Sequence, residues 1–111
     1  MSKDEKYKHE KKVKNIFHRR IEDKDQVIVL FYATWCAFSQ RFLPIFEEYS
    51  KSNLKDCLTV IIDDDPEVCQ EYSINYYPTV IIFKKGKVQK RLDSKLGIGL
   101  NKKQLIEFTE N

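Results

Sequence analysis

Apolar residues along the chain fall into runs that have the pattern of β-strands. The run QVIVLFYA at 26–33 is almost unbroken and rich in β-branched and aromatic side chains, which is typical of a central strand buried on both faces. The run CLTVII at 57–62 predicts a second buried strand. The segment TVIIFKKGKVQKRL at 79–92 predicts two antiparallel strands around a turn at Lys85–Gly86, the second with one face toward water.

Three segments between and after these strands have helical patterns. Apolar side chains at i, i+4, i+7, i+8 and i+11 predict a helix with a kink at Pro44; the stripe comprises Phe38, Phe42, Ile45, Phe46 and Tyr49. The segment DDDPEVCQEY predicts a short helix with Asp65 as N-cap and Pro66 in the first position. Asn101 as N-cap and Gln104 as its capping-box partner predict a last helix.

The first 20 residues account for the excess of positive charge over negative charge in the chain. They contain eight of the 20 Lys and Arg residues and three of the 17 Asp and Glu residues, and the net charge of the whole chain is +3. Apolar residues at roughly helical intervals predict a surface helix over 5–20. Because acidic residues interrupt the basic ones and only Tyr7 and Phe17 are there to stack on bases, we expect no nucleic-acid partner.

The predicted order of elements is α β α β α β β α, within one domain spanning 1–111. It comprises a basic N-terminal helix at 1–20 and a core at 26–109. Two neighbouring strands form a hairpin, whereas the others need helical crossovers. The fold class is therefore α/β, with a central mixed sheet of about four strands and helices on both faces.

The hydropathy of the chain and its cysteine content indicate the compartment in which the protein acts. No window approaches the ~18 consecutive apolar residues of a membrane span, and the first residues lack the apolar core of a secretion signal. Three cysteines cannot all pair internally, which indicates a reducing compartment. We therefore expect a cytoplasmic monomer with no membrane partner; the alternative is a domain cut from a longer protein of the endoplasmic reticulum.

Cys36 is the candidate nucleophile because it follows a buried strand and lies where the next helix begins. A thiolate attacks disulfides, and an ordinary cysteine of pKa ~8.5 is mostly protonated at neutral pH. Free N–H groups and the helix dipole at a helix N-terminus favour the ionised form. The alternative interpretation, a buried thiol that only fills space, fits less well beside Trp35 at a surface edge.

Ser39 stands where a second thiol would complete a redox pair. In a dithiol site the second sulfur attacks the mixed disulfide from within the molecule and releases the client. A serine cannot form that bond, but one helical turn from Cys36 its hydroxyl is expected to donate a hydrogen bond to the sulfur. A Cys36 adduct should therefore persist until an outside thiol, such as glutathione or a client's own second cysteine, resolves it.

The chain resembles the thioredoxin family along nearly its full length, through VLFYATWCAFS, Pro44, the later YPTVIIFKKGKV and LNKKQLIEF. The segment FYATWCAFSQRFLPIFEEYS is also similar to the retention chaperone of the protein disulfide isomerase group, whose site is Cys-Arg-Phe-Ser. The resemblance implies a cis Tyr77–Pro78 bond beside Cys36. It also implies a groove for extended clients, lined by Trp35, Cys36, Ala37, Phe38, Tyr77, Pro78 and Thr79.

Departures from the family pattern agree with a site that has one cysteine. Leu30 stands where thioredoxins keep a buried carboxylate, and Thr59 where many keep a lysine. The resemblance implies that the acid takes the proton from the resolving thiol, so without that thiol a buried charge brings only a desolvation cost. An engineered Cys→Ser exchange would normally retain the carboxylate, which favours a natural serine over an engineered one.

The remaining candidate residues have structural interpretations. We expect Cys57 and Cys69 to be buried or half-buried thiols rather than redox partners of Cys36. No cysteine pair has zinc-ligand spacing, and His9 and His18 lie nine apart, so both should be solvated and no metal site is expected. The acidic residues at 63–65 should serve helix capping and solvation rather than bind a cation.

Two functions fit this sequence. The first is a monothiol thioredoxin-like protein that performs thiol–disulfide exchange through Cys36, with Ser39 assisting. Its partners would be proteins with exposed cysteines or disulfides, with glutathione as a candidate resolving thiol and no bound cofactor. The second is a redox-inactive binding module, chaperone or adaptor that uses the same groove.

Overall fold

The structure is a computed structural model that describes residues 16–110. A helical segment at 16–22 leads into β1 (Val27–Tyr32), and the later elements follow in the predicted order. They are α2 (Ala37–Ser52), β2 (Asp56–Ile61), α3 (Pro66–Glu71), β3 (Thr79–Lys84), β4 (Lys87–Asp93) and α4 (Lys102–Glu110). The part of the predicted N-terminal helix before residue 16, with His9, lies outside the described residues.

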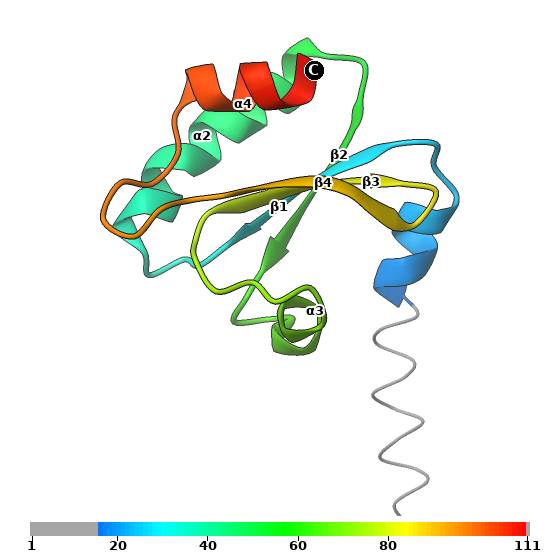
Figure 1. Cartoon of the computed structure of the whole chain (residues 1–111), viewed down its shortest axis with the longest axis horizontal. Coiled ribbons are helices and arrows are strands. Elements are labelled where there is room, and N and C mark those ends of the chain that lie inside the picture. The colour runs from blue at the N-terminus through cyan, green and yellow to red at the C-terminus, as the bar shows by residue number, and fades with distance from the viewer. Residues whose placement is uncertain (1–15, 111) are drawn as a thin grey trace, which may run out of the picture.

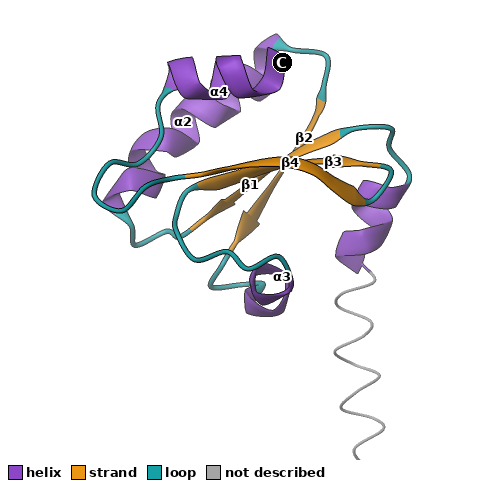
Figure 2. Ribbon diagram, in the orientation of Figure 1, coloured by secondary structure: helices purple, strands orange, loops and turns teal. Residues whose placement is uncertain are grey.

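The four strands form one mixed sheet in the order β2-β1-β3-β4. β1 runs parallel to β2 and antiparallel to β3, and β3 forms a hairpin with β4. Helices α2 and α4 cover one face of the sheet, while α3 and the 16–22 segment lie on the other (Figure 1). Figure 2 shows the same two helical layers on either side of the strands. The predicted fold class is confirmed.

β2 differs from the prediction of a buried strand. It lies at the edge of the sheet, and within it only Val60 is fully buried. Hydrophobic periodicity reports the faces of a strand but not its place in the sheet, and CLTVII therefore resembled a buried strand. β1 is the central strand that was predicted, with five of its six residues buried.

Residues of β1 alternate between two separate cores. Val27, Val29 and Phe31 join the core beneath α3, whereas Ile28 and Leu30 join the core beneath α2 and α4. This is the period of two that a strand imposes on its side chains. The first core also contains Phe17 and Ile21, so the packed domain begins before the boundary predicted at residue 26.

Contacts of the 16–22 segment correct one further expectation. The Nε2 atom of His18 lies 2.8 Å from the Oε2 atom of Glu71 in α3, so this ring is not simply solvated. The contact joins two helices that lie on the same face of the sheet. This polar contact therefore adds to the apolar packing of Phe17 and Ile21 in holding the 16–22 segment on the sheet.

Local signals at the helix and hairpin ends are borne out. Asn101 and Gln104 exchange two hydrogen bonds, of 2.8 and 2.9 Å, which is the predicted capping box of α4. Asp65 holds the N-cap position of α3 and Pro66 the first position, but Asp65 makes no side-chain capping bond. The β3–β4 turn has positive φ at Lys85 (51°) and Gly86 (83°), as a tight hairpin requires.

Candidate active site

Cys36 holds the N-cap position of α2, four residues after the end of β1. Its N–H donates to the carbonyl of Ala33 at 3.2 Å, and its own carbonyl accepts the N–H of Gln40 at 2.9 Å. The first bond closes the turn and the second begins the helix. The side chain is half-buried, so the sulfur lies at the surface edge that the sequence predicted.

The sulfur of Cys36 faces the loop before β3. Its Sγ atom donates a hydrogen bond to the carbonyl oxygen of Tyr77 at 3.7 Å, and the Tyr77–Pro78 peptide bond is cis. Both the cis bond and its place beside Cys36 agree with the resemblance. Burial raises the pKa of the Tyr77 phenol, and the nearby Cys69 and Asp63 raise it further, so this ring stays neutral at physiological pH.

Ser39 lies within one turn of Cys36, but its hydroxyl serves another purpose. The residue is 0% exposed, and its Oγ accepts the N–H of Ala33 at 3.2 Å. The predicted hydrogen bond from Ser39 to the Cys36 sulfur is not formed within the described residues, because the sulfur is directed toward Tyr77. Ser39 therefore stabilises the β1–α2 turn from below.

Trp35 is held by Asp63, a residue that was expected only to cap a helix or be solvated. The carboxylate accepts the indole N–H at 3.1 Å and the hydroxyl of Thr34 at 3.0 Å. The indole is 64% exposed and meets the Tyr77 ring edge-on, with centroids 5.9 Å apart. A signal for this contact was present, because parallel pairing brings the residues after β2 beside those after β1.

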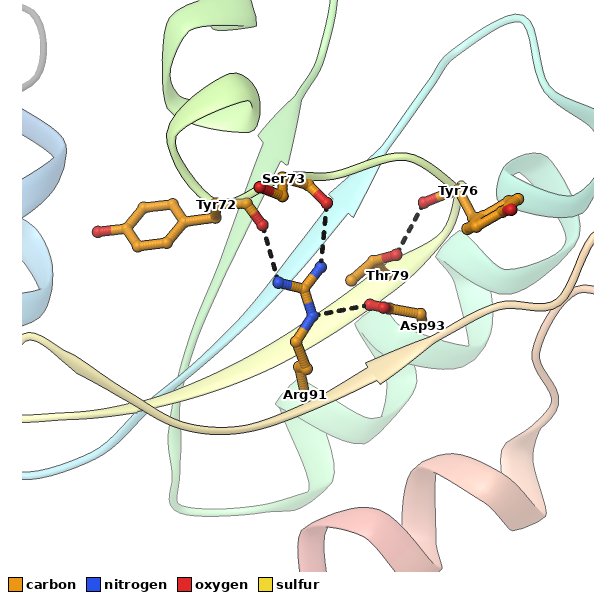
Figure 3. A network of polar contacts seen from close by, with 6 residues as sticks. All are labelled: Tyr72, Ser73, Tyr76, Thr79, Arg91 and Asp93. Atoms are coloured by element: carbon orange, nitrogen blue, oxygen red, sulfur yellow. Dashed lines mark hydrogen bonds and ion pairs between the residues drawn. The ribbon is translucent and has the colours of Figure 1, made fainter.

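Arg91 of β4 fixes the loop that carries Tyr77. Its guanidinium donates to the carbonyls of Tyr72 at 2.8 Å and Ser73 at 3.3 Å, and its Nε donates to Asp93 at 3.0 Å (Figure 3). No pattern in the sequence predicted this role of Arg91. At the other end of the loop, the hydroxyl of Thr79 donates to the carbonyl of Tyr76 at 2.7 Å.

A groove of about 240 Å³ opens beside the Cys36 sulfur. It is lined by Cys36, Phe38, Asn75, Tyr76, Tyr77, Ser94, Lys95, Leu96 and Gly97. Among the predicted groove residues, Thr79 and Pro78 are buried, and with Ala37 and Trp35 they lie outside the lining of this groove. Thr79 cannot line the groove, because its side chain turns back to the preceding loop. The contribution of residues 94–97 was not predicted.

The other two cysteines are shielded, as expected. Burial raises the pKa of both Cys57 and Cys69 to about 11, so both thiols stay protonated near neutral pH. Leu30 is fully buried and pairs in register with the exposed Thr59, so the two departures from the family pattern are neighbours across the β1–β2 ladder.

The described residues, 16–110, hold neither a candidate membrane span nor a cluster of metal-ligating side chains. No described helix is long and apolar enough to cross a membrane. No group of three or more His, Cys, Asp or Glu side chains in this range could hold a metal ion.

A thiol at a helix N-terminus beside a cis-proline loop, on a four-stranded mixed sheet, defines the class of thioredoxin-fold proteins. The family model named Thioredoxin matches residues 8–111, and the chain belongs to the thioredoxin family. The solved structure of Plasmodium falciparum thioredoxin superposes with a TM-score of 0.76 at 30% identity, covering 85% of this chain and 88% of that one.

Curated relatives include two longer proteins. Thioredoxin Y2, chloroplastic, of Arabidopsis thaliana is 39% identical over 101 residues, which cover 87% of this chain and 58% of that protein. Endoplasmic reticulum resident protein 44 of Bos taurus is 37% identical over 79 residues, which cover 64% of this chain and 20% of that protein. The chain thus spans little more than half of the first relative and a fifth of the second.

Proposed function

We propose that this chain is a monothiol member of the thioredoxin family, which exchanges disulfides through Cys36 alone. The sulfur of Cys36 attacks a client or glutathione disulfide, so one S–S bond forms as another breaks. The displaced thiolate takes up the proton that Cys36 loses, and no outside oxidant is needed. The resulting mixed disulfide persists until a second external thiol attacks it.

One observation carries this proposal: a serine is buried where a resolving thiol would have to lie. Ser39 is fully enclosed beneath the turn that presents Cys36, and its oxygen is bonded to the backbone of that turn. Cys57 and Cys69 are protonated and shielded. The buried Leu30 also supports a site with one thiol, because at this position there is no carboxylate to take a proton from a resolving thiol.

The proposed partners are proteins with exposed cysteines or disulfides, and glutathione as the resolving thiol. We propose a monomer that binds no cofactor and acts in the cytoplasm. The similarity to endoplasmic reticulum resident protein 44 supports the endoplasmic reticulum as the alternative location. The segment FYATWCAFSQ also supports a likeness to the Cys-x-x-Ser chaperone of the protein disulfide isomerase group.

A binding module that uses the groove without exchange is the second candidate. It is favoured by the apolar character of the groove, in which Lys95 is the only charged lining residue among those described. Such a module would bind clients equally well with Cys36 replaced by Ser. A monothiol exchanger would lose its covalent complexes in that variant.

Mass spectrometry under non-reducing conditions tests the proposal. The protein is incubated with glutathione disulfide and with a glutathionylated test protein, then digested to locate each adduct. We expect adducts on Cys36, their loss in Cys36→Ser, and their retention in a Cys57→Ala/Cys69→Ala double variant. Adducts confined to Cys57 or Cys69, or no adducts at all, would overturn the proposal.

A further inference from the structure

The two edges of the sheet differ in how they are protected against pairing with another strand. β4 forms one edge, and its seven residues include Lys87, Lys90 and Arg91. Gln89 is left out of its ladder with β3, which makes a bulge in this strand. Charged side chains, above all lysine, and bulges keep an edge strand from pairing further. β2 forms the other edge and has no bulge, and its only charged residue is Asp56 at the first position.

The backbone of β2 presents hydrogen-bonding groups along its outer side. Just after the strand, the N–H of Ile62 donates to the carbonyl of Tyr32 in β1 at 3.0 Å. Successive residues of a strand turn their backbone groups to opposite sides, so Cys57, Thr59 and Ile61 face away from β1. No strand among residues 16–110 pairs with this side of β2. Only the Ile61 carbonyl is bonded there, to N–H groups of the turn that follows.

The side chains of β2 leave this outer side accessible. Thr59, in the middle of the strand, is exposed, and Cys57 and Ile61 are half-buried. The one carboxylate of the strand, on Asp56, is already paired, because its Oδ1 atom lies 3.6 Å from Nζ of Lys24. No unpaired charge within β2 therefore opposes the approach of a second strand.

The charges that flank β2 have opposite signs at its two ends. Lys51 and Lys55 precede the strand, whereas three aspartates follow it at 63–65. In an antiparallel pair of identical strands, the basic end of each copy meets the acidic end of the other, which is attractive. A parallel pair would bring like charges together. The pattern therefore fits an antiparallel second copy of the same strand.

We propose that two copies of this chain associate through β2, with the strands antiparallel and the twofold axis at Thr59. The two four-stranded sheets then become one continuous sheet. In this register the two Thr59 residues lie opposite each other, and Cys57 of each copy lies opposite Ile61 of the other. The outward backbone groups of the two strands thus meet, and Lys55 lies opposite Asp63.

This association leaves the groove beside Cys36 open. No residue of β2, or of the segments on either side of it at 51–55 and 62–65, lines that groove. Each copy keeps a complete site, so the monomer proposed above remains the unit that exchanges disulfides, and the dimer forms from it as the concentration rises. The inference does not rest on the proposed function, and either can fail without the other.

Sedimentation velocity over a dilution series tests the association. The full chain is kept in a reducing buffer, so that no disulfide can link two copies. We expect the weight-average mass to rise from that of one chain toward that of two as the concentration approaches about 1 mM, the weak end of the affinity scale. Added salt should shift the equilibrium toward the monomer, because it screens the charges at the strand ends.

Two edge variants locate the contact. Thr59→Lys places like charges directly opposite each other in the proposed pair, and should raise the dissociation constant of the dimer at least about tenfold. Val88→Lys is the matched control, because Val88 is 46% exposed on the opposite edge of the sheet, in β4. It should leave the dissociation constant unchanged. Both positions are exposed, so the urea midpoints and the alkylation rate of Cys36 should stay close to those of the wild type.

A disulfide tests the register. Opposed residues of a hydrogen-bonded antiparallel pair have Cα atoms about 5.5 Å apart, which a disulfide can span. In a Cys36→Ser background, Thr59→Cys should give a linked dimer when glutathione disulfide is added as the oxidant, with the link located by mass spectrometry. Val88→Cys in the same background should give far less linked dimer. Equal yields in the two variants would overturn the register.

Three results would overturn the dimer itself. The first is a monomer at every concentration, and the second is association that Thr59→Lys leaves unchanged. The third is association that Val88→Lys weakens as much, which would place the contact outside β2. In a monomeric protein, slow hydrogen exchange at the amides of Cys57 and Thr59 would show that another part of the same chain covers this edge. None of these results bears on adduct formation at Cys36.

Discussion

The thiol of Cys36 donates a hydrogen bond to the backbone carbonyl of Tyr77, across 3.7 Å between sulfur and oxygen and 41 positions of sequence. The nucleophile and the loop before the cis-proline therefore form one unit. Any shift of that loop changes the surroundings of the sulfur, and any client that pairs with the loop backbone comes to lie beside it. The contacts that hold the loop are accordingly part of the site.

Arg91→Lys should loosen this loop. Arg91 bonds two successive backbone carbonyls and Asp93 at once, whereas a lysine ammonium is a point charge without the planar fork. We expect faster amide hydrogen exchange over 72–78 and a loss of about 1 kcal/mol of unfolding free energy. Mixed-disulfide formation with peptides should slow a few-fold, whereas alkylation of Cys36 by a small reagent should not. Lys87→Ala, on the same strand, is the control. Unchanged amide hydrogen exchange over 72–78 in Arg91→Lys would contradict the role of Arg91 in holding the loop.

Ser39→Cys should convert the site to a dithiol. The new sulfur would lie within one turn of Cys36 and attack any mixed disulfide formed there at high effective concentration. We expect client adducts to become too short-lived for isolation, and an internal disulfide to appear by mass spectrometry. Ser39→Ala is the matched control. It keeps persistent adducts but costs about 1–3 kcal/mol of stability, because the buried N–H of Ala33 loses its acceptor. Long-lived adducts in Ser39→Cys would count against the monothiol mechanism.

Asp63→Ala should free the indole of Trp35. Both hydrogen bonds to the carboxylate are lost, and the chain has a single tryptophan, so fluorescence anisotropy reports on this side chain alone. We expect lower anisotropy, with stability changed by no more than about 1 kcal/mol because the site is exposed. The neighbouring Asp64→Ala provides the comparison and should leave anisotropy unchanged. Equal anisotropy in the two variants would show that Asp63 does not hold Trp35.

Alkaline pH should weaken the fold through the buried thiols. Burial raises the pKa of Cys57 and Cys69 from 9.0 to about 11, so the unfolded chain loses these protons first as the pH rises. The contribution of the two protonated thiols to the free energy of unfolding is fully present below about pH 9. It is lost as the pH rises from there toward about 11. The urea midpoint of the wild type should therefore fall more steeply over this range than that of Cys69→Ala. If the urea midpoint falls equally steeply with pH in the wild type and in Cys69→Ala, the buried thiol does not contribute to the loss of stability.

Features that depend on neighbouring residues were predictable from the sequence. The capping box at Asn101 and Gln104 and the turn at Lys85–Gly86 are local motifs, and the structure reproduces both. The position of Cys36 at a strand–helix junction is equally local. Each depends on spacings of a few residues, which periodicity and turn chemistry report directly.

Contacts between distant residues were predictable only where pairing could be inferred. The contact between Asp63 and Trp35 could have been predicted, since pairing of parallel strands places the two residues side by side. Arg91 was not, because nothing in a strand of exposed charges indicates which one reaches a loop 18 residues earlier. The place of Leu96 in the groove lining was also not predictable, because the loop that carries it packs through Gly99 on Phe38. No periodic pattern in the sequence indicates such a contact.

The alternation along β1 has a consequence for how this protein can change. Val29 and Leu30 are adjacent in the chain, yet each is enclosed by a different layer of helices. Substitutions in the layer under α3 therefore reach the layer that supports Cys36 only through the strand backbone. The two halves of the interior are free to diverge independently, and a new acid or thiol could be accommodated under the active site without repacking the opposite side.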